Sequence, residues 1–589
     1  MSTAILTGPP VAMSPIEGDL RNLGFEVVTA TDAASLAGRL QAVPAGERVA
    51  IVDPRFVGHV HALRLGLTDP RFDASAVPGA VSVRPAARAA LARAVAETGE
   101  EGDGETLADR LAGRIEKDGV PVRRPELGTL VATVPADAAA RAAAASAVAA
   151  VDDEAVRLRS AVKSRDGFFT TFFISPYSRY IARWCARRGL TPNQVTTASL
   201  LVALIAAGCA ATGTRPGFVA AGVLLLASFV LDCTDGQLAR YSLQYSTLGA
   251  WLDATFDRAK EYAYYAGLAL GAARGGDDVW ALALAAMVLQ TCRHVVDFAF
   301  AETTPDTGTG AAALSRKLDG VGWTVWLRRM IVLPIGERWA LIAVLTAVTT
   351  PRTTFTVLIA ASALAGCYTT AGRVLRSVRR RTPSSGAVAR ALGDLTDTGP
   401  VGEGLSRAFR GHGVPAAALL GAAVMIATSL LAPAGSAWPL AAAGFYAVTS
   451  ALAVARPLKG ALDWIVPPVF RAAEYTTILV LAAVSDVNGA LPAAFGLVAA
   501  VAYHHYDTVY RIRGGTGAPP RVLIRATAGH EGRVLLVTAA AVALAHDTGF
   551  TVALTVLAVA LAVVVLTESI GFWVSSQAPA VHDETGGPA

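Results

Sequence analysis

Four aspartates lie close together in the sequence, within residues 231–262. Asp232 and Asp235 are three residues apart, and Asp253 and Asp257 are four residues apart. On a helix, each of these spacings puts both carboxylates of a pair on one face. Two helices joined by a short connection can therefore point four carboxylates at one volume.

Four clustered carboxylates favour divalent-metal chemistry. Like charges at close range raise one another's pKa, and a bound cation removes this repulsion. Carboxylate oxygens are hard ligands, which favours Mg²⁺ or Mn²⁺ over Zn²⁺. Two such ions could hold a pyrophosphate or phosphoryl group between them. The alternative, ordinary helix-end charges that face the cytosol, is disfavoured because the aspartates recur in register within apolar segments.

Small and basic residues between the aspartates fit a phosphate-containing ligand. Gly236, Ala239 and Gly249 remove side-chain bulk, so that a ligand can lie against the backbone. Arg240 can hold a phosphate through its planar set of donors.

The composition indicates that the elements which position these residues lie in a membrane. Of the 589 residues, 53% are hydrophobic and 16% are charged, whereas a soluble domain carries about 25% charged residues. From about residue 190 onward, apolar segments of roughly 17 to 25 residues recur, the length of a helix that crosses a bilayer. They predict about twelve spans in two sets of about six. The first set is predicted at 193–213, 216–235, 247–272, 277–299, 335–352 and 354–376, and the second at 414–432, 438–455, 465–485, 490–510, 532–548 and 551–575.

Basic residues indicate the orientation of these spans. The first residues lack the basic segment and long apolar stretch of a cleaved signal peptide, so we expect the amino terminus in the cytosol. Short cytoplasmic loops collect Lys and Arg. With this orientation most basic residues near the spans fall inside, among them Arg183, Arg187, Arg188, Arg376, Arg456, Arg511 and Arg513. We therefore predict an integral protein of a bacterial-type inner or plasma membrane, with the four aspartates on the cytosolic side.

The sequence pattern predicts five regions. Strand-like runs alternate with helix-like stretches at the start, which indicates a cytosolic α/β domain with a parallel sheet over residues 1–135. Residues 136–189 are predicted as connecting and interfacial helices, because 168–188 mixes aromatic residues with arginines. The alternative there is a soluble helix packed on the upstream domain. A six-helix membrane domain at 190–380, a cytosolic linker at 381–412 and a second membrane domain of about six helices at 413–578 follow.

Charge and cysteine content exclude other classes of protein. Lys and Arg total 51 against 46 Asp and Glu, and the resulting charge of +5 is too mild to indicate a nucleic-acid partner. Five cysteines without paired spacing indicate neither a disulfide framework nor a zinc site.

The aspartate segment resembles the signature of the CDP-alcohol phosphotransferase (CDP-alcohol phosphatidyltransferase) family. The match covers every fixed position of Asp232-x-x-Asp235-Gly236-x-x-Ala239-Arg240-x8-Gly249-x-x-x-Asp253-x-x-x-Asp257. Residues 191–196 at the start of the first predicted span also look like the family's segment there. The resemblance covers about 160–380 and implies a fold of six transmembrane helices.

The resemblance also implies a role for each matching residue. Asp232, Asp235 and Asp253 would bind two metal ions, Mg²⁺ or Mn²⁺, and Asp257 would bind one ion and act as general base. The CDP moiety would contact Gly236, Ala239, Arg240 and Gly249, with Ser246, Asn193 and Thr196 as further candidates. The family cleaves the pyrophosphate of a CDP-linked donor, releases CMP and transfers the remaining phosphoryl group to an alcohol. A lipid donor, CDP-diacylglycerol, in phospholipid biosynthesis is favoured here, and a homodimer is left open.

Segments 163–167 and 334–338 look similar to a branch of the family in which a nucleotidyltransferase-like domain precedes the membrane enzyme. That branch includes users of inositol phosphate, which makes inositol phosphate a candidate acceptor. Arg179, Arg293 and Arg373 are candidates to bind an acceptor phosphate, and snorkelling of Arg293 and Arg373 toward the interface is the alternative.

In the N-terminal domain, the first predicted strand is followed by residues 7–10, Thr-Gly-Pro-Pro. The two prolines lack the backbone N–H groups that a phosphate-binding loop would use as donors. We therefore expect a degenerate nucleotidyltransferase-like domain with a regulatory or docking role.

The second membrane set has charges but no second aspartate signature. Arg471 and Glu474 fall in one predicted span, and His504, His505, Asp507 and Arg511 fall near the inner end of another. These residues indicate either an interior polar site or buried ion pairs that join helices.

Two rival functions stay open. A soluble CDP-alcohol such as CDP-inositol would be the donor in an enzyme like di-myo-inositol phosphate phosphate synthase, and a transporter or scaffold would use the aspartates to coordinate a cation.

Overall fold

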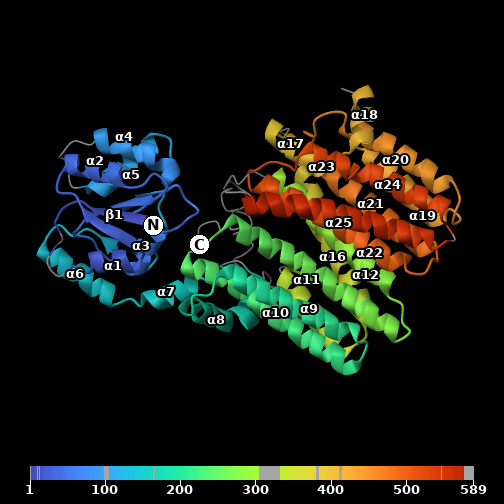
Figure 1. The fold of residues 1–589 in the computed structure, drawn as a ribbon, viewed down its shortest axis with the longest axis horizontal. Helices are drawn as coiled ribbons and strands as arrows, with labels where there is room; N and C mark the ends of the chain where they lie inside the picture. Colours follow the sequence, from blue (N-terminus) through green and yellow to red (C-terminus); the bar gives the residue numbers. More distant parts are fainter. Residues whose placement is uncertain are drawn as a thin grey trace.

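The computed structural model describes residues 2–9, 11, 14–97, 105–163, 166–303, 332–379, 384–409, 414–545 and 547–575. Ser164 and Arg165 of the 163–167 segment lie outside these residues, as does most of the connection between the predicted spans 277–299 and 335–352. Figure 1 shows an α/β domain beside a large helical region, to which α6 and α7 connect it.

The N-terminal domain is built around a six-stranded sheet with the order β2-β1-β3-β6-β5-β7. Strand β1 (Ser2–Leu6) pairs in parallel with β2 (Phe25–Thr29) and β3 (Arg48–Val52), and β5 (Ala74–Val77) pairs in parallel with β7 (Val122–Arg123). The prediction of a parallel sheet was wrong for β6 (Ala80–Val83), which is antiparallel to β3 and β5. The reason is the tight turn at Pro78-Gly79, where Gly79 has a φ of +79° and returns the chain beside β5.

Helices cover both faces of this sheet (Figure 1). Alternating strand residues point to opposite faces, so that Ile5 and Ile51 pack with α2 (Ala33–Ala42), α4 (Arg88–Glu97) and α5 (Leu107–Lys117). Leu6 and Val52 pack with α1 (Ile16–Asn22) and α3 (Val60–Leu67) on the other face. A two-stranded sheet of β4 (Val57–Gly58) and β8 (Ala132–Thr133) lies outside the main sheet.

Short helices lead from this domain to the membrane region. They are α6 (Ala138–Ala149), α7 (Asp153–Ser160), the π-helical turn Thr170–Ile174 and α8 (Ser175–Arg187). Tyr177, Tyr180 and Trp184 of α8 are exposed. Exposed aromatic rings beside arginines are typical of a helix at the headgroup level.

A helix lies at each of the predicted spans. The first set is α9 (Pro192–Ala211), α10 (Arg215–Ser242), α11 (Thr247–Arg274), α12 (Trp280–Glu302), α15 (Ile335–Val348) and α16 (Pro351–Val378). The second set is α19 (Ala417–Leu431), α20 (Trp438–Val454), α21 (Val466–Val484), α22 (Ala490–Arg513), α24 (Gly529–Ala543) and α25 (Gly549–Ser575). The segment predicted as a linker contains α17 (Gly386–Leu395) and α18 (Pro400–Ala408), and α23 (Arg521–Ala526) precedes α24.

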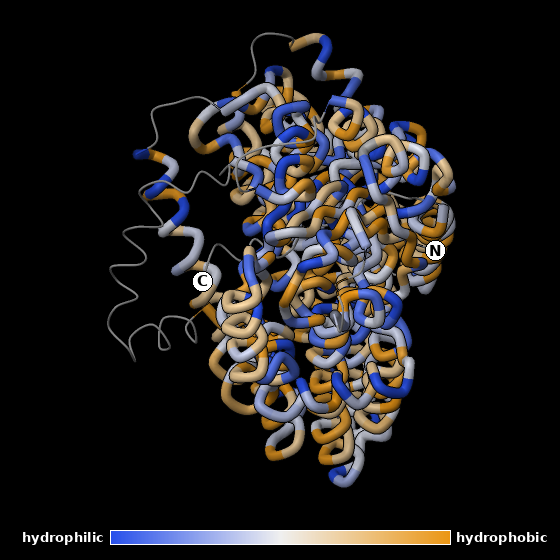
Figure 2. Tube along the Cα trace, turned by 90° about the vertical axis from the view of Figure 1, so that its left-hand side faces the viewer, coloured by the Kyte–Doolittle hydropathy of each residue, from blue (hydrophilic) through white to orange (hydrophobic). Residues whose placement is uncertain are grey.

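Six of the described helical segments are long and apolar enough to cross a membrane, so twelve spans are not confirmed. The six are α9, α10, α12, α16, the segment Asp463–Val484 that includes α21, and α25. Helices α15, α19, α20 and α24 have 14, 15, 17 and 15 residues, shorter than the roughly 20 that a span needs. Helix α11 is long enough, but charged residues interrupt its apolar sequence. Hydrophobic residues dominate the helices in the lower part of Figure 2.

The two helical sets share one hydrophobic core. Tyr265 and Leu268 of α11 belong to the same buried cluster as Ile478 of α21, Val498 of α22 and Leu561 of α25. The second set therefore packs directly on α11, the helix that carries Asp253 and Asp257.

Candidate active site

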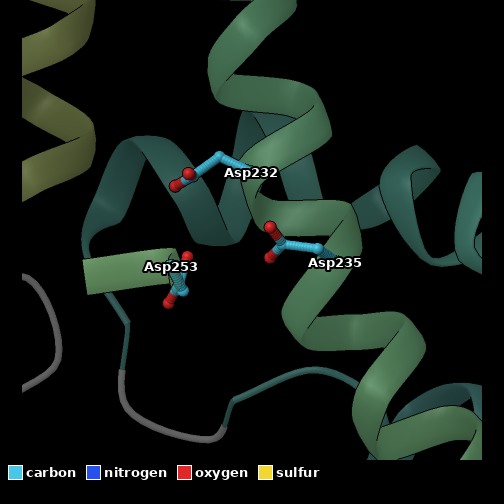
Figure 3. Close-up of side chains that lie close together, drawn as sticks. All are labelled: Asp232, Asp235 and Asp253. Carbon is cyan, nitrogen blue, oxygen red and sulfur yellow. The ribbon is translucent and has the colours of Figure 1, made fainter. Parts of the chain in front are cut away.

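Asp232, Asp235 and Asp253 lie close together between α10 and α11 (Figure 3). Each offers a carboxylate oxygen, and these oxygens all lie within 4.8 Å of one another. Within the described ranges, no other group of three or more His, Cys, Asp or Glu side chains meets this criterion.

Local sequence explains the two helices that hold the site. Helix α10 has 28 residues and continues past Asp235 to Ser242, so the first pair lies inside the helix, near the predicted end of the span at residue 235. A helix of this length spans about 42 Å, more than the roughly 30 Å of a bilayer core. Its last turns can therefore reach beyond the lipid. Ser246 begins α11 as its N-cap, with its Oγ accepting a hydrogen bond of 2.9 Å from the Gly249 amide.

Asp257 is connected to the cluster through Lys260. The Lys260 ammonium lies 3.0 Å from a carboxylate oxygen of Asp257 and forms a second ion pair with Asp232. It also donates a hydrogen bond of 3.1 Å to Ser199 Oγ of α9. Lys260 is only 1% exposed, so the ammonium is a buried counter-charge held by three helices. Lys260 is not among the predicted site residues, although its position three residues after Asp257 puts it on the same helix face.

The side chains present fit divalent cations. Asp235 is buried, and its Oδ2 has no hydrogen-bond partner within the described residues. The Lys260 ammonium pairs with Asp232 and Asp257, and hard cations suit the clustered carboxylate oxygens of Asp232, Asp235 and Asp253. Asp232, Asp235 and Asp253 supply oxygen ligands from two helices, and Asp257 lies one turn beyond Asp253.

Three of the residues predicted to contact CDP lie together at the start of α11. A Cβ added at Gly249 would lie 2.6 Å from Asn193 Oδ1 and 2.8 Å from Ser246 Oγ. Gly249 thus makes room for these two side chains. Thr196 is buried one turn further along α9, where its hydroxyl donates to the Pro192 carbonyl at 3.0 Å.

The other predicted CDP contacts lie along α10, on the side where α7 and the following residues pack. The Arg240 guanidinium donates a hydrogen bond of 2.6 Å to the Ala161 carbonyl. A Cβ added at Gly236 would meet this guanidinium at 3.5 Å, so Gly236 and Arg240 are adjacent, and Ala239 is half-buried beside them. The connecting segment after α7 therefore holds Arg240 beside Gly236, the residue that follows Asp235.

The predicted acceptor arginines have protein partners. Arg293 of α12 donates to Gln290 at 3.3 Å and to the Val332 carbonyl at 2.8 Å. Arg373 of α16 is ion-paired with Asp297. Arg179 of α8 lies 5.1 Å from the centre of the Tyr180 ring. The segment 334–338 contacts the chain near 167 through Glu337, which accepts hydrogen bonds from the Phe168 and Phe169 amides.

A buried polar network that the sequence analysis missed lies beside the aspartates. Arg258, directly after Asp257, donates to Glu261 at 2.8 Å, and Arg338 donates to the same carboxylate at 3.3 Å. His294 of α12 lies 3.4 Å from the Arg258 guanidinium. The spacing of Arg258 and Glu261, three residues apart, was the available signal.

In the second helical set, the charges form buried ion pairs. Arg471 lies 2.7 Å from Glu474, which also pairs with Arg533 of α24. Asp397, in the segment predicted as a linker, lies 3.3 Å from Arg471 and 2.6 Å from Arg533. His504 lies 3.3 Å from Asp397. These ion pairs join α21, α24 and the turn between α17 and α18.

A second ion-pair group lies further along α22. Arg511 lies 2.8 Å from Asp507 and 2.6 Å from Glu568 of α25. His505 is buried nearby on the same helix. The charges of the second set were predicted to form either an interior polar site or buried ion pairs that join helices. The observed contacts are buried ion pairs.

Comparison with known families gives two matches along the chain. Residues 189–365 match the CDP-alcohol phosphatidyltransferase family, and residues 386–589 match a family of unknown function (DUF5941). No curated protein matches the chain. The first match contains α9 to α12 and the whole aspartate signature, so residues 189–365 form a CDP-alcohol phosphatidyltransferase domain on membrane helices, which makes the protein a phosphotransferase enzyme.

Proposed function

We propose that the enzyme transfers a phosphatidyl group from CDP-diacylglycerol to an alcohol, with inositol phosphate as the first acceptor to test. The observation that carries the proposal is the group of three carboxylates within 4.8 Å inside the matched family domain. Helices α9 and α10 expose apolar side chains, among them Leu201, Ile205 and Val223. A donor with acyl chains can therefore lie in the bilayer against the helices that carry the site.

The proposed ligands for two ions of Mg²⁺ or Mn²⁺ are Asp232, Asp235, Asp253 and Asp257. When bound, these ions would spread the negative charge of the pyrophosphate and of the leaving group. Arg240 would hold a phosphate of the donor through its planar guanidinium. Asn193, Thr196, Ser246 and Gly249 would line the site at the start of α9 and α11.

In the proposed reaction, Asp257 accepts the proton of the acceptor hydroxyl. The hydroxyl oxygen then forms a bond to the phosphorus that carries the diacylglycerol group, and the bond from that phosphorus to the bridging oxygen of the pyrophosphate breaks. CMP leaves with the bridging oxygen and the electron pair of that bond. Lys260, 3.0 Å from Asp257, keeps this carboxylate ionised until it takes the proton.

The test is CMP release by the purified full-length enzyme in nanodiscs, with Mg²⁺ or Mn²⁺ and a panel of alcohols that includes inositol phosphate. Removal of a general base lowers the rate by about 10²- to 10⁴-fold, so Asp257→Asn should show such a loss. The matched control is Asp277→Asn, because Asp277 lies in an exposed ion pair with Arg352, in the connection between α11 and α12. CMP release from CDP-inositol but not from CDP-diacylglycerol would replace the lipid donor with a soluble one. Absence of CMP release from both donors would refute the proposal.

A further inference from the structure

The helix that carries Asp253 and Asp257 is covered by the region whose family has no known function. Helices α22 and α25 of residues 386–589 both pack against α11. Helix α11 is not among the candidate spans, and it buries Arg258, Lys260 and Glu261. Because lipid cannot solvate these charges, α11 needs protein neighbours on every side where they point.

A tryptophan pair forms the first contact. Trp251, two residues before Asp253, stacks on Trp573 of α25 with the ring centres 6.0 Å apart and the planes at 19°. Both rings are buried, with 6% and 2% of their surfaces exposed. An aromatic pair of this kind contributes about 0.5–1.5 kcal/mol beyond the area that it buries.

Asp507 of α22 fixes the orientation of Trp573. The indole Nε1 donates a hydrogen bond of 2.7 Å to Asp507, which also accepts one of 2.6 Å from Ser569 of α25. Arg511 lies 2.8 Å from the same carboxylate. A hydrogen bond to an ionised group is stronger than a neutral one, so the ring that contacts Trp251 is held in one position.

Tyr506 forms the second contact, on the other side of the aspartates. Its hydroxyl is hydrogen-bonded to His294 Nδ1, and its ring lies 5.5 Å from the guanidinium of Arg258. Arg258 directly follows Asp257, and His294 Nδ1 lies 3.4 Å from it. The two contacts, at Trp251 and Arg258, therefore bracket about two turns of α11 that contain Asp253 and Asp257.

We propose that residues 386–589 position the metal-binding turns of α11 for catalysis, with Trp573 and Tyr506 as positioning residues. The inference rests on the proposed function of the aspartates as metal ligands. Catalytic groups must be held within about 0.5 Å of their productive geometry, and a displacement of about 1 Å can cost 10²-fold in rate. Helix α11 is bound to α25 and α22 at both ends of the reactive segment, which restricts such displacements.

The test compares Trp573→Ala with Trp438→Ala in the full-length enzyme in nanodiscs. Trp438 lies on α20 of the same region and is 69% exposed, so its removal should leave all parameters at the wild-type level. We expect Trp573→Ala to lower kcat by about ten- to a hundredfold and to raise the Mn²⁺ concentration at half-maximal rate, with KM for the donor little changed. Trp573→Phe, which keeps a stacked ring, should recover most of kcat.

Mn²⁺ binding, measured by electron paramagnetic resonance without substrate, separates the two proposals. Wild-type enzyme that binds Mn²⁺ but releases no CMP would refute the proposed reaction, and weaker binding by Trp573→Ala would still support positioning. Unchanged kcat and unchanged Mn²⁺ affinity in Trp573→Ala would overturn the positioning role. If Trp573→Ala does not fold, Tyr506→Phe serves instead, because it keeps the ring and removes only the hydroxyl next to His294. Wild-type kcat and Mn²⁺ affinity in that variant would likewise overturn the inference.

Discussion

Replacement of Lys260 by methionine tests whether this ammonium is the built-in counter-charge of the aspartate cluster. The methionine side chain fills a similar space but removes the positive charge from between Asp232 and Asp257. In the wild-type protein the ammonium is 1% exposed and contacts both carboxylates. Removal of one partner of a buried ion pair costs about 3–5 kcal/mol, because the other charge stays buried without compensation.

We therefore expect the Lys260→Met protein to unfold at a lower temperature in a chelator, with a loss of stability of about 3–5 kcal/mol. A divalent ion stabilises the folded state by RT ln(1 + [L]/Kd), about 2.7 kcal/mol at a hundred times Kd. The variant lacks the ammonium that repels a metal ion, so Mn²⁺ should bind to the variant more tightly than to the wild type. Mn²⁺ should therefore raise the unfolding temperature of the variant by more than it raises that of the wild type.

The assay is thermal unfolding of the full-length protein in nanodiscs, in EDTA and across a Mn²⁺ titration. Lys459→Met is the control, because Lys459 is exposed and lies in the second helical region. A Lys260→Met midpoint in EDTA equal to that of the wild type would refute the buried counter-charge. An equal gain from Mn²⁺ in both proteins would refute the competition between the ammonium and the ion.

Two further predictions concern the start of α11 and the N-terminal domain. Gly249→Ala puts a methyl group 2.6 Å from Asn193 Oδ1, so we expect a higher KM for the CDP donor and a loss of about 1–3 kcal/mol in stability, measured by CMP release and thermal unfolding. His61 is buried without hydrogen-bond partners among the described residues, and burial lowers its pKa to about 4. A histidine in the unfolded chain titrates near 6.5. The N-terminal domain should therefore lose stability as the pH falls from about 6.5 to about 4, by at most about 3 kcal/mol. Hydrogen exchange in β1 and β3 measures this loss.

Matched variants make both results decisive. Gly404→Ala, a helix position in α18 where an added Cβ meets no atom of the described part of the chain within 4 Å, is the control for Gly249→Ala. Equal KM values in the two variants would contradict the role of Gly249. His61→Leu should remove the part of the acid sensitivity that this group causes, and an unchanged pH dependence of exchange in that variant would contradict the assignment.

Local patterns predicted much of the site. The three- and four-residue spacings of the aspartates define helix faces by themselves, and the apolar segments located each helix, although α10 extends to Ser242, beyond the predicted end at residue 235. The apolar pattern did not predict correctly which of these helices are long and apolar enough to cross a membrane. Helix α11 is too charged, and several helices are too short, to count as spans by themselves.

Other parts of the site depend on residues far apart in the sequence. The alternation in the first 125 residues indicated an α/β domain but could not show that β6 runs antiparallel, because that depends on the turn at Gly79. Gly249 looked like space for a ligand, whereas Asn193 and Ser246 fill that space. The segment 381–412 looked like a linker because of its Gly, Ser and Pro content, yet Asp397 within it is buried between two arginines.

By itself, the sequence determined the type of chemistry and the helices that carry it, because an acidic signature in apolar segments depends only on neighbouring residues. Only the tertiary structure decided which groups surround the aspartates. Lys260 reaches Asp232 from another helix, and Trp573 reaches Trp251 from the far end of the chain. Such contacts follow from how helices pack across one shared core, and no periodicity within a single segment records them.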